Sequence, residues 1–195
     1  MRIGVLKEPP AETRVSLLPE HIATLKKWNV DVCIERGAGE QAFAADIKYT
    51  EAGATVCSRE EVLQSSDIVL SIQLPASAEL PALSSKVLLG VYQPLFQAAL
   101  MKELAEKGLT IFSMDMLPRT TRAQSMDVLS SQANIAGYKA VVMAADRYQK
   151  FFPMLMTAAG TVKAARVVIL GVGVAGLQAI ATARDRKSTR LNSSH

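Results

Sequence analysis

The sequence is poor in cysteine, in aromatic residues and in long apolar runs, and each shortage excludes a class of protein. Only two of its 195 residues are cysteines, Cys33 and Cys57, which excludes a disulfide-rich scaffold. Their spacing matches neither a metal-binding motif nor a redox motif. We therefore expect both to be small, buried apolar side chains of a protein in a reducing compartment.

No uninterrupted apolar run reaches the roughly 18 residues that a membrane-spanning helix needs. The closest candidate, residues 87–101, is interrupted by Gln93, Pro94 and Gln97. The first residues do not form a signal peptide, because their apolar run is short and charged residues and prolines follow it at once. These absences predict a soluble, cytoplasmic chain.

Neither the charge nor the apolar content is extreme. The net charge is +4, and the basic residues form no stripe with aromatic or glycine residues between them, so we expect no nucleic-acid partner. Hydrophobic residues make up 49% of the chain, which is enough to bury a core and excludes a disordered protein. The length fits one domain, or one domain and a portion of another.

Short β-rich segments alternate with segments of helical periodicity, which is typical of an α/β fold with a parallel sheet. Strands are predicted at residues 2–6, 30–34, 55–57, 67–72, 87–91, 109–113 and 166–170. Helices are predicted at residues 19–28, 46–52, 58–64, 95–107, 125–150 and 176–183. Ser58 and Glu61, three residues apart, have the pattern of a helix capping box.

The pattern divides the chain into four segments. Residues 1–125 form an N-terminal α/β domain, and residues 126–157 a long connecting helix with a linker. Residues 158–184 begin a Rossmann dinucleotide-binding domain, which is incomplete because one strand and one helix cannot cover both faces of a sheet. Residues 185–195 are polar and non-periodic, and we interpret them as an artefactual tail outside the fold. A natural disordered end and a basic nucleic-acid-binding tail are the alternatives.

A Gly-x-Gly-x-x-Gly motif occupies residues 171–176, between a predicted strand and a predicted helix, as the dinucleotide fingerprint requires. Gly171 permits the tight turn, Gly173 lets a pyrophosphate approach the backbone, and Gly176 lets helix and strand pack closely. The motif predicts a dinucleotide site at the helix N-terminus, and a purely structural turn is the alternative. The acidic residue expected about 20 residues later is missing, because residues 186–195 contain none.

A polar segment at residues 118–132 follows a predicted strand, at the end of the strand where α/β proteins bind ligands. It contains arginine, glutamine, aspartate and serine, which together donate and accept hydrogen bonds in many directions. Such groups suit a nicotinamide carboxamide and ribose hydroxyls. The alternative is a solvated loop that leads into a capped helix.

Several motifs together carry a resemblance to a known family: residues 1–8 with 12–15, residues 35–39, residues 118–138, and residues 158–160 before the glycine motif. The chain resembles the NAD(H)-binding component, or alpha subunit, of proton-translocating NAD(P)⁺ transhydrogenases, in the alanine dehydrogenase/transhydrogenase family. The resemblance extends from residue 1 to about residue 184, and residues 122–127 are its most specific segment. The chain is thus expected to be a C-terminally truncated member.

The resemblance implies a function and a set of contacts. Arg119, Gln124 and Asp127, with Ser130 following, would contact the nicotinamide end of NAD(H). Hydride would pass from NADH to NADP⁺ held on a partner component, and a membrane component would couple this transfer to proton movement. The family also implies a homodimer through the second domain, attached to the inner membrane through partner subunits. Alone, this fragment is expected to bind NADH poorly and to be inactive.

Two other functions stay open. An alanine dehydrogenase-like oxidoreductase needs a lysine and a histidine near the ends of two strands, where this sequence has Ser71 and, beside Tyr92, no histidine. His21 lies on an early predicted helix and is expected at the surface, so the acid–base group is missing. Ser71 also replaces a lysine often found in transhydrogenases. The second alternative is a truncated product without activity.

Overall fold

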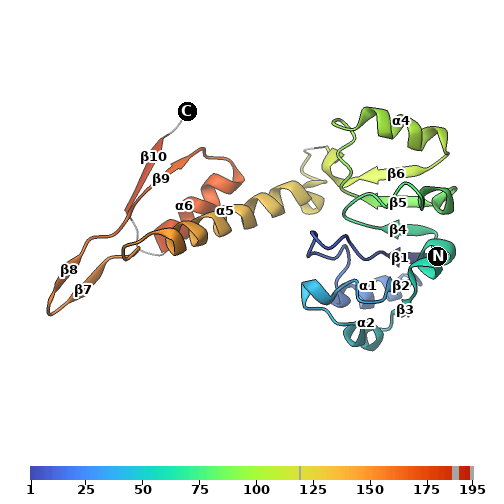
Figure 1. The fold of residues 1–195 in the computed structure, drawn as a ribbon, viewed down its shortest axis with the longest axis horizontal. Coiled ribbons are helices and arrows are strands. Elements are labelled where there is room, and N and C mark those ends of the chain that lie inside the picture. The colour runs from blue at the N-terminus through green and yellow to red at the C-terminus, as the bar shows by residue number, and fades with distance from the viewer. Residues whose placement is uncertain (119, 186–188, 194–195) are drawn as a thin grey trace. The chain divides into compact units, whose positions relative to one another are not determined.

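The structure, a computed structural model, describes residues 1–118, 120–185 and 189–193 of the chain (Figure 1). They form two compact units that divide between Met126 and Asp127. The first unit contains a parallel six-stranded sheet, and the second contains a parallel pair of strands joined by a helix. The predicted α/β class is therefore confirmed.

The sheet of the first unit has the strand order β3-β2-β1-β4-β5-β6, and all its strands are parallel. The strands are Arg2–Val5 (β1), Asp31–Glu35 (β2), Thr55–Cys57 (β3), Ile68–Leu70 (β4), Val87–Gly90 (β5) and Thr110–Ser113 (β6). The chain adds β2 and β3 on one side of β1 and then β4 to β6 on the other. The strand order therefore reverses between β1 and β4, and the carboxyl ends of these two strands are the position where such sheets bind ligands.

Helices connect these strands. They are Ile22–Lys27 (α1), Asp46–Ala52 (α2), Arg59–Ser65 (α3) and Ala98–Glu106 (α4). Short 3-10 helices cover Pro19–His21 (η1), Glu40–Ala42 (η2), Leu80–Leu83 (η3), Met114–Met116 (η4) and Gln124–Met126 (η5). The predicted capping box of α3 is confirmed, because the Glu61 amide donates to Ser58 Oγ at 3.2 Å and the Ser58 amide donates to Glu61 Oε2 at 2.7 Å.

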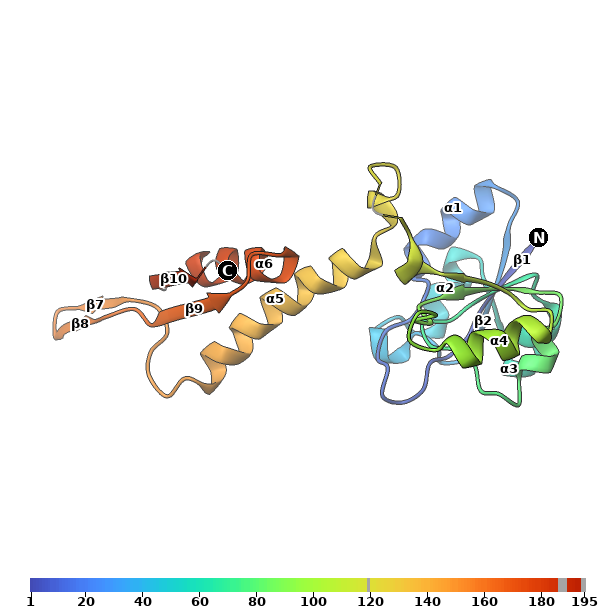
Figure 2. The same cartoon turned by 90° about the horizontal axis from the view of Figure 1, so that it is seen from above.

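The two faces of the sheet carry separate apolar clusters, because successive residues of a strand point to opposite faces. In β2, Val32 and Ile34 belong to one cluster and Cys33 to the other. Ile22 of α1 and Tyr49 of α2 complete the first cluster, and residues of α3 and α4 complete the second. Figure 2 shows α1 and α4 on opposite sides of the strands.

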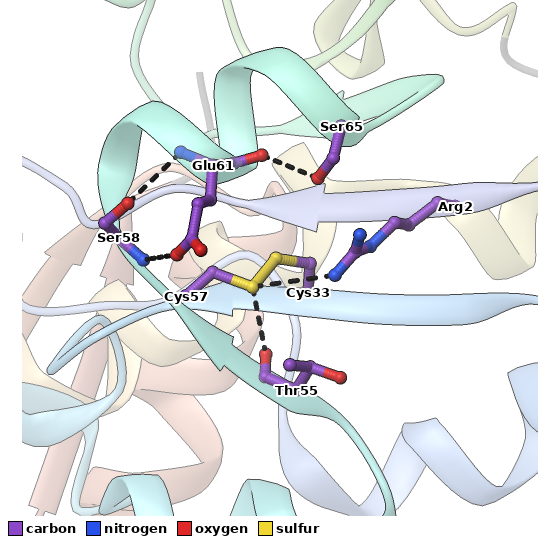
Figure 3. The surroundings of a disulfide bond; sticks show 7 residues. All are labelled: Arg2, Cys33, Thr55, Cys57, Ser58, Glu61 and Ser65. Atoms are coloured by element: carbon purple, nitrogen blue, oxygen red, sulfur yellow. Dashed lines mark hydrogen bonds between the residues drawn. A yellow bond between two sulfur atoms is a disulfide. The ribbon is translucent and has the colours of Figure 1, made fainter.

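A disulfide bond joins Cys33 of β2 to Cys57 of β3 (Figure 3). The parallel register places Cys33 beside Thr55 and Glu35 beside Cys57, and the α-carbons of the two cysteines lie 6.1 Å apart. The prediction of two free thiols is therefore wrong, although their predicted burial is confirmed. Sequence spacing does not reveal the bond, because only the pairing of β2 with β3 makes the two cysteines neighbours. The expectation of a reducing compartment rested on the small number of cysteines, and disulfide bonds are rare in such compartments.

The second unit begins with a long helix, Val128–Arg147 (α5). An antiparallel hairpin of Leu155–Thr157 (β7) and Gly160–Val162 (β8) follows, and then Arg166–Leu170 (β9), Val174–Asp185 (α6) and Thr189–Ser193 (β10). The apolar core of this unit consists of Val141, Phe152, Ala165, Ala179 and Ala183. Even α5, with 20 residues, is not apolar enough to cross a membrane, and the same holds for every other described helix.

Two features of the second unit differ from the prediction. The segment predicted as a helix and linker up to residue 157 contains β7, which pairs with β8. Within the segment 185–195, predicted to lie outside the fold, the described residues are Asp185, which ends α6, and Thr189–Ser193 (β10), which pair with β9 in a parallel register from Thr189 opposite Arg166. Backbone N–H and C=O groups form such a ladder, so the polar composition of the segment does not prevent it. The predicted single strand is therefore a pair.

Candidate dinucleotide-binding site

The glycine motif forms the turn between β9 and α6. Gly171 directly follows β9 and has a φ of 108°, a conformation that residues with a side chain rarely adopt. A Cβ atom at Gly176 would lie 2.2 Å from the Gly171 carbonyl oxygen, so only glycine permits this close approach of helix and turn. A Cβ atom at Gly173 would meet nothing within 4 Å. The turn is thus tightly packed at Gly176 and open at Gly173.

The first turn of α6 adds backbone amides to this open space. The Leu177 amide donates to the carbonyl oxygen of Gly173, the residue before the helix, at 2.8 Å. The amides of Val174, Ala175 and Gly176 precede it and have no acceptor within the helix. Amides at a helix N-terminus bind phosphate groups, because they donate hydrogen bonds at the positive end of the helix dipole. The residues present therefore fit a dinucleotide pyrophosphate.

Two predicted site residues meet at the N-terminus of α5. Asp127 is the N-cap residue, and its carboxylate accepts hydrogen bonds from the Ser130 amide at 3.0 Å and from the Ser130 hydroxyl at 2.6 Å. These bonds satisfy an amide that the helix leaves without a partner. The structure therefore gives Asp127 and Ser130 a common role as a helix cap, and their contact with a nicotinamide stays a prediction.

The other two residues predicted for the nicotinamide end belong to the polar segment before α5. Gln124 begins η5 and is exposed, and the neighbouring Ala123 is buried. Arg119 lies outside the described residues. Gln124 belongs to the first unit, and Asp127 begins the second, so their assembly around one ligand also stays a prediction.

A cleft of about 490 Å³ at the carboxyl ends of β1 and β4 is a feature that sequence reasoning missed. Its lining combines leucines, prolines and an alanine with the polar residues Lys7, Glu8, Glu35, Gln41, Arg59, Ser71 and Gln73. Glu8 is buried, and its carboxylate accepts hydrogen bonds from the amides of Ile72, at 2.5 Å, and Gln73, at 3.1 Å. Burial raises the pKa of Glu8, and these two hydrogen bonds oppose the rise. In the sequence, the charged residues Lys7 and Glu8, which directly follow the first strand, could have indicated this cleft.

Arg59 is paired with two acidic residues of this region. Its guanidinium forms ion pairs with Glu35, at 2.8 Å, and with Glu79, and it donates to the Lys7 carbonyl oxygen at 3.2 Å. Hydrogen bonding to Arg59 holds the pKa of Glu79 below its usual range. Because its charge is already shared between two carboxylates, Arg59 is poorly suited to bind an anionic substrate.

The strand ends that would carry the lysine and histidine of an alanine dehydrogenase hold a pair of hydroxyl groups. Ser71 Oγ and Tyr92 Oη lie 2.9 Å apart, and both residues are 2% exposed. Burial raises the pKa of Tyr92 to about 12, so its hydroxyl stays protonated at neutral pH. His21 has an exposed side chain and lies in η1, beside Glu20. The Ser71–Tyr92 pair therefore offers no proton shuttle for amino-acid oxidation.

Two domain models of one family together match most of the chain. The model of the N-terminal domain of alanine dehydrogenase/PNT matches residues 4–136, and that of the C-terminal domain matches residues 140–189. The chain is 43% identical to an NAD(P) transhydrogenase alpha subunit protein of Rhodospirillum rubrum, with 94% of the chain and 50% of that protein covered. It is 27% identical to an alanine dehydrogenase of Staphylococcus saprophyticus, with 92% and 49% covered. The chain thus spans about half the length of these relatives.

Solved structures give the same order of similarity. A transhydrogenase from Sinorhizobium meliloti superposes with a TM-score of 0.94 at 42% identity, covering 100% of this chain and 59% of that one. An L-alanine dehydrogenase superposes with a TM-score of 0.82 at 26% identity, covering 100% and 61%. Both the sequence and the backbone are therefore more similar to the transhydrogenases than to the alanine dehydrogenases among these relatives.

Proposed function

The chain belongs to the alanine dehydrogenase/PNT family, and from this premise we propose that it is the NAD(H)-binding portion of a transhydrogenase. The observation that carries the proposal is the turn between β9 and α6. There, Gly173 has open space around it, and the three backbone amides that follow it come before the first hydrogen bond of the helix. The closer similarity to transhydrogenase subunits, at 43% identity against 27% for an alanine dehydrogenase, supports this branch of the family.

In this proposal the chain binds and orients the cofactor. The amides of Val174 to Gly176 hold the pyrophosphate, and Gly173 leaves the space for it. Arg119, Gln124, Asp127 and Ser130 are assigned to the nicotinamide end, because they supply donors and acceptors for a carboxamide and for ribose hydroxyls. Hydride transfer is the chemistry that a bound nicotinamide supplies, and the polypeptide provides position and electrostatics.

The partners belong to the same proposal. NADP(H) is held on a second component, and a membrane component couples hydride transfer to proton movement, so that this chain attaches to the inner membrane only through partner subunits. We also propose a homodimer through the second unit. The hairpin β7–β8 supports it, because all six of its strand residues are exposed and an isolated two-stranded hairpin is marginally stable in water. The apolar side chains Leu155, Met156 and Val162 are among them.

An amino-acid dehydrogenase is the second candidate, and the Ser71–Tyr92 pair argues against it. Oxidation of an amino acid requires a group that accepts a proton near neutral pH. A tyrosine with a pKa of about 12 does not accept one, and serine does not titrate in this range.

The proposal is tested by titrating the chain with NADH and following the ligand signals by NMR, in parallel with a Gly173→Val variant. We expect weak binding, because a helix N-terminus contributes only about 0.3–1 kcal/mol at an exposed site and residues 186–195 contain no acid to bind the adenosine ribose. The valine side chain fills the open space and should abolish this binding.

Equal binding by the wild-type chain and Gly173→Val would refute the assignment of the turn. An Ala105→Val variant is the control, because Ala105 is exposed on α4 in the first unit, apart from the glycine turn. Hydride transfer is then assayed by mixing the chain with the NADP(H)-binding and membrane components of a related transhydrogenase and following NADP⁺ reduction by NADH.

A further inference from the structure

Helices α5 and α6 pack side by side within the second unit (Figure 1, Figure 2). On α6, Ala179 and Ala183 are buried and belong to the core, and Ala175 lies one turn before them. On α5, Gly137 and Val141 are the buried residues, also one turn apart. Rows of residues four apart form the ridges by which helices pack closely, and small side chains reduce the distance between the two axes.

At Gly137 the backbone of α5 lies close to the backbone of α6. A Cβ atom at this position would lie 2.1 Å from the Ala175 carbonyl oxygen and 2.9 Å from its carbonyl carbon. These are backbone atoms, which cannot rotate away as the end of a long side chain can. A glycine within a helix costs about 1 kcal/mol relative to alanine, so helix stability does not account for Gly137, whereas this contact does.

The contacted atoms belong to the candidate dinucleotide site. The Ala175 carbonyl and the Gly176 amide form one planar peptide group, and the Gly176 amide is the last of the three that precede the first bond of α6. On its other side the same peptide is confined by the turn, since a Cβ atom at Gly176 would lie 2.2 Å from the Gly171 carbonyl oxygen. The peptide group is therefore held between Gly137 of α5 and Gly171 of the turn.

We propose that Gly137 is a positioning residue for the pyrophosphate-binding turn. A side chain at this position would displace the Ala175–Gly176 peptide group and turn the Gly176 amide away from the phosphate. Hydrogen bonds lose strength steeply when their geometry is distorted, so a displacement of a few tenths of an ångström is sufficient. The inference rests on the proposed function of this turn and adds a residue outside the glycine motif to it.

The first experiment measures hydrogen exchange along the full chain without ligand. The variants are Gly137→Ala, Val141→Ala, which loosens the helix packing one turn away from the site, and Ala140→Ser, which adds one atom on the exposed side of α5. Gly137→Ala should accelerate exchange of the amides at residues 171–178 and leave the C-terminal half of α6 protected. Val141→Ala should not produce this localised effect, and Ala140→Ser should resemble the wild type. Unchanged exchange at residues 171–178, or a uniform loss of protection along α5 and α6, would overturn the proposal.

The second experiment titrates the same variants with NADH and with ADP-ribose, which carries the pyrophosphate but no nicotinamide. For Gly137→Ala the Kd of both ligands should rise by the same factor, about tenfold, which corresponds to about 1.4 kcal/mol. A merely structural role of the helix contact would weaken binding as much in Val141→Ala as in Gly137→Ala, and that result would refute positioning. If the wild-type chain binds neither ligand, the proposed function fails instead, and the exchange experiment alone decides whether Gly137 holds the turn.

Discussion

The disulfide between Cys33 and Cys57 should contribute a large share of the stability of the first unit. The two cysteines are separated by 24 residues in sequence. In the loop-entropy treatment, a cross-link across about 24 residues removes enough conformational entropy from the unfolded chain to stabilise the fold by about 3.5 kcal/mol at 25 °C. A typical domain has a free energy of unfolding of about 5–15 kcal/mol. Reduction should therefore leave the unit folded but much less stable.

The structure indicates why the reduced form should keep its fold. Both cysteines belong to an apolar cluster with Leu6, Val69 and Leu88, and a buried thiol packs like a small apolar group. The ladder between β2 and β3 is made by backbone groups, so it does not depend on the disulfide. With a denaturant slope of about 2 kcal/mol per molar urea, the midpoint of unfolding should fall by about 1.7 M on reduction.

The assay is urea unfolding, followed by circular dichroism, of chain purified without reductant and of the same chain after treatment with dithiothreitol. A Cys33→Ala/Cys57→Ala double variant is the control, because its midpoint should not respond to dithiothreitol. Thiols are counted under denaturing conditions before reduction. Two reactive thiols in the untreated chain, or equal midpoints before and after reduction, would refute the reasoning.

Three further outcomes are expected. Trypsin should cut first after Arg122, which is exposed in the polar segment before α5, and mass spectrometry of a time course that finds this bond resistant would contradict the prediction. Arg59→Ala should lower the free energy of unfolding by about 1–2 kcal/mol. Arg59 holds the pKa of Glu79 below its ordinary value of 4.5. The stability that this ion pair contributes is therefore present above pH 4.5 and is lost as the pH falls through the lowered pKa. The melting temperature of the variant should consequently fall less on acidification than that of the wild type. Finally, NADH oxidation in the presence of pyruvate and ammonia should not exceed the blank even when the chain is extended to the full length of its relatives, and measurable turnover would show that the Ser71–Tyr92 pair does not exclude amino-acid chemistry.

Signals between residues close in sequence, such as hydrophobic periodicity and capping residues, predicted most of the secondary structure. The strands of the first sheet and the long helix α5 follow from hydrophobic periodicity, and the start of α3 follows from the spacing of Ser58 and Glu61. The glycine turn between β9 and α6 follows from the position of its motif between a strand and a helix. The family resemblance, which the comparisons confirm, depends on such local motifs distributed along the chain.

The features that were missed depend on contacts between segments that are distant in sequence. Cys33 and Cys57 become neighbours only because β3 pairs with β2, and Gly137 meets Ala175 only because α5 packs against α6. Strand β10 was missed because its sequence is polar, whereas its pairing uses backbone groups. The cleft at β1 and β4 depends on the strand order, which periodicity does not determine.

The surroundings of Ser71 show what the serine does at a position where we expected a lysine from the family resemblance. The serine is buried, and its hydroxyl forms a neutral hydrogen bond with Tyr92. A lysine in this place would bring an ammonium group to the cleft that also contains the buried carboxylate of Glu8. With serine, the negative charge of Glu8 is stabilised by the amides of Ile72 and Gln73 and by the nearby Arg59, and burial still raises the pKa of Glu8. Ser71 therefore places a neutral hydroxyl, hydrogen-bonded to Tyr92, at a position where a lysine would place a positive charge.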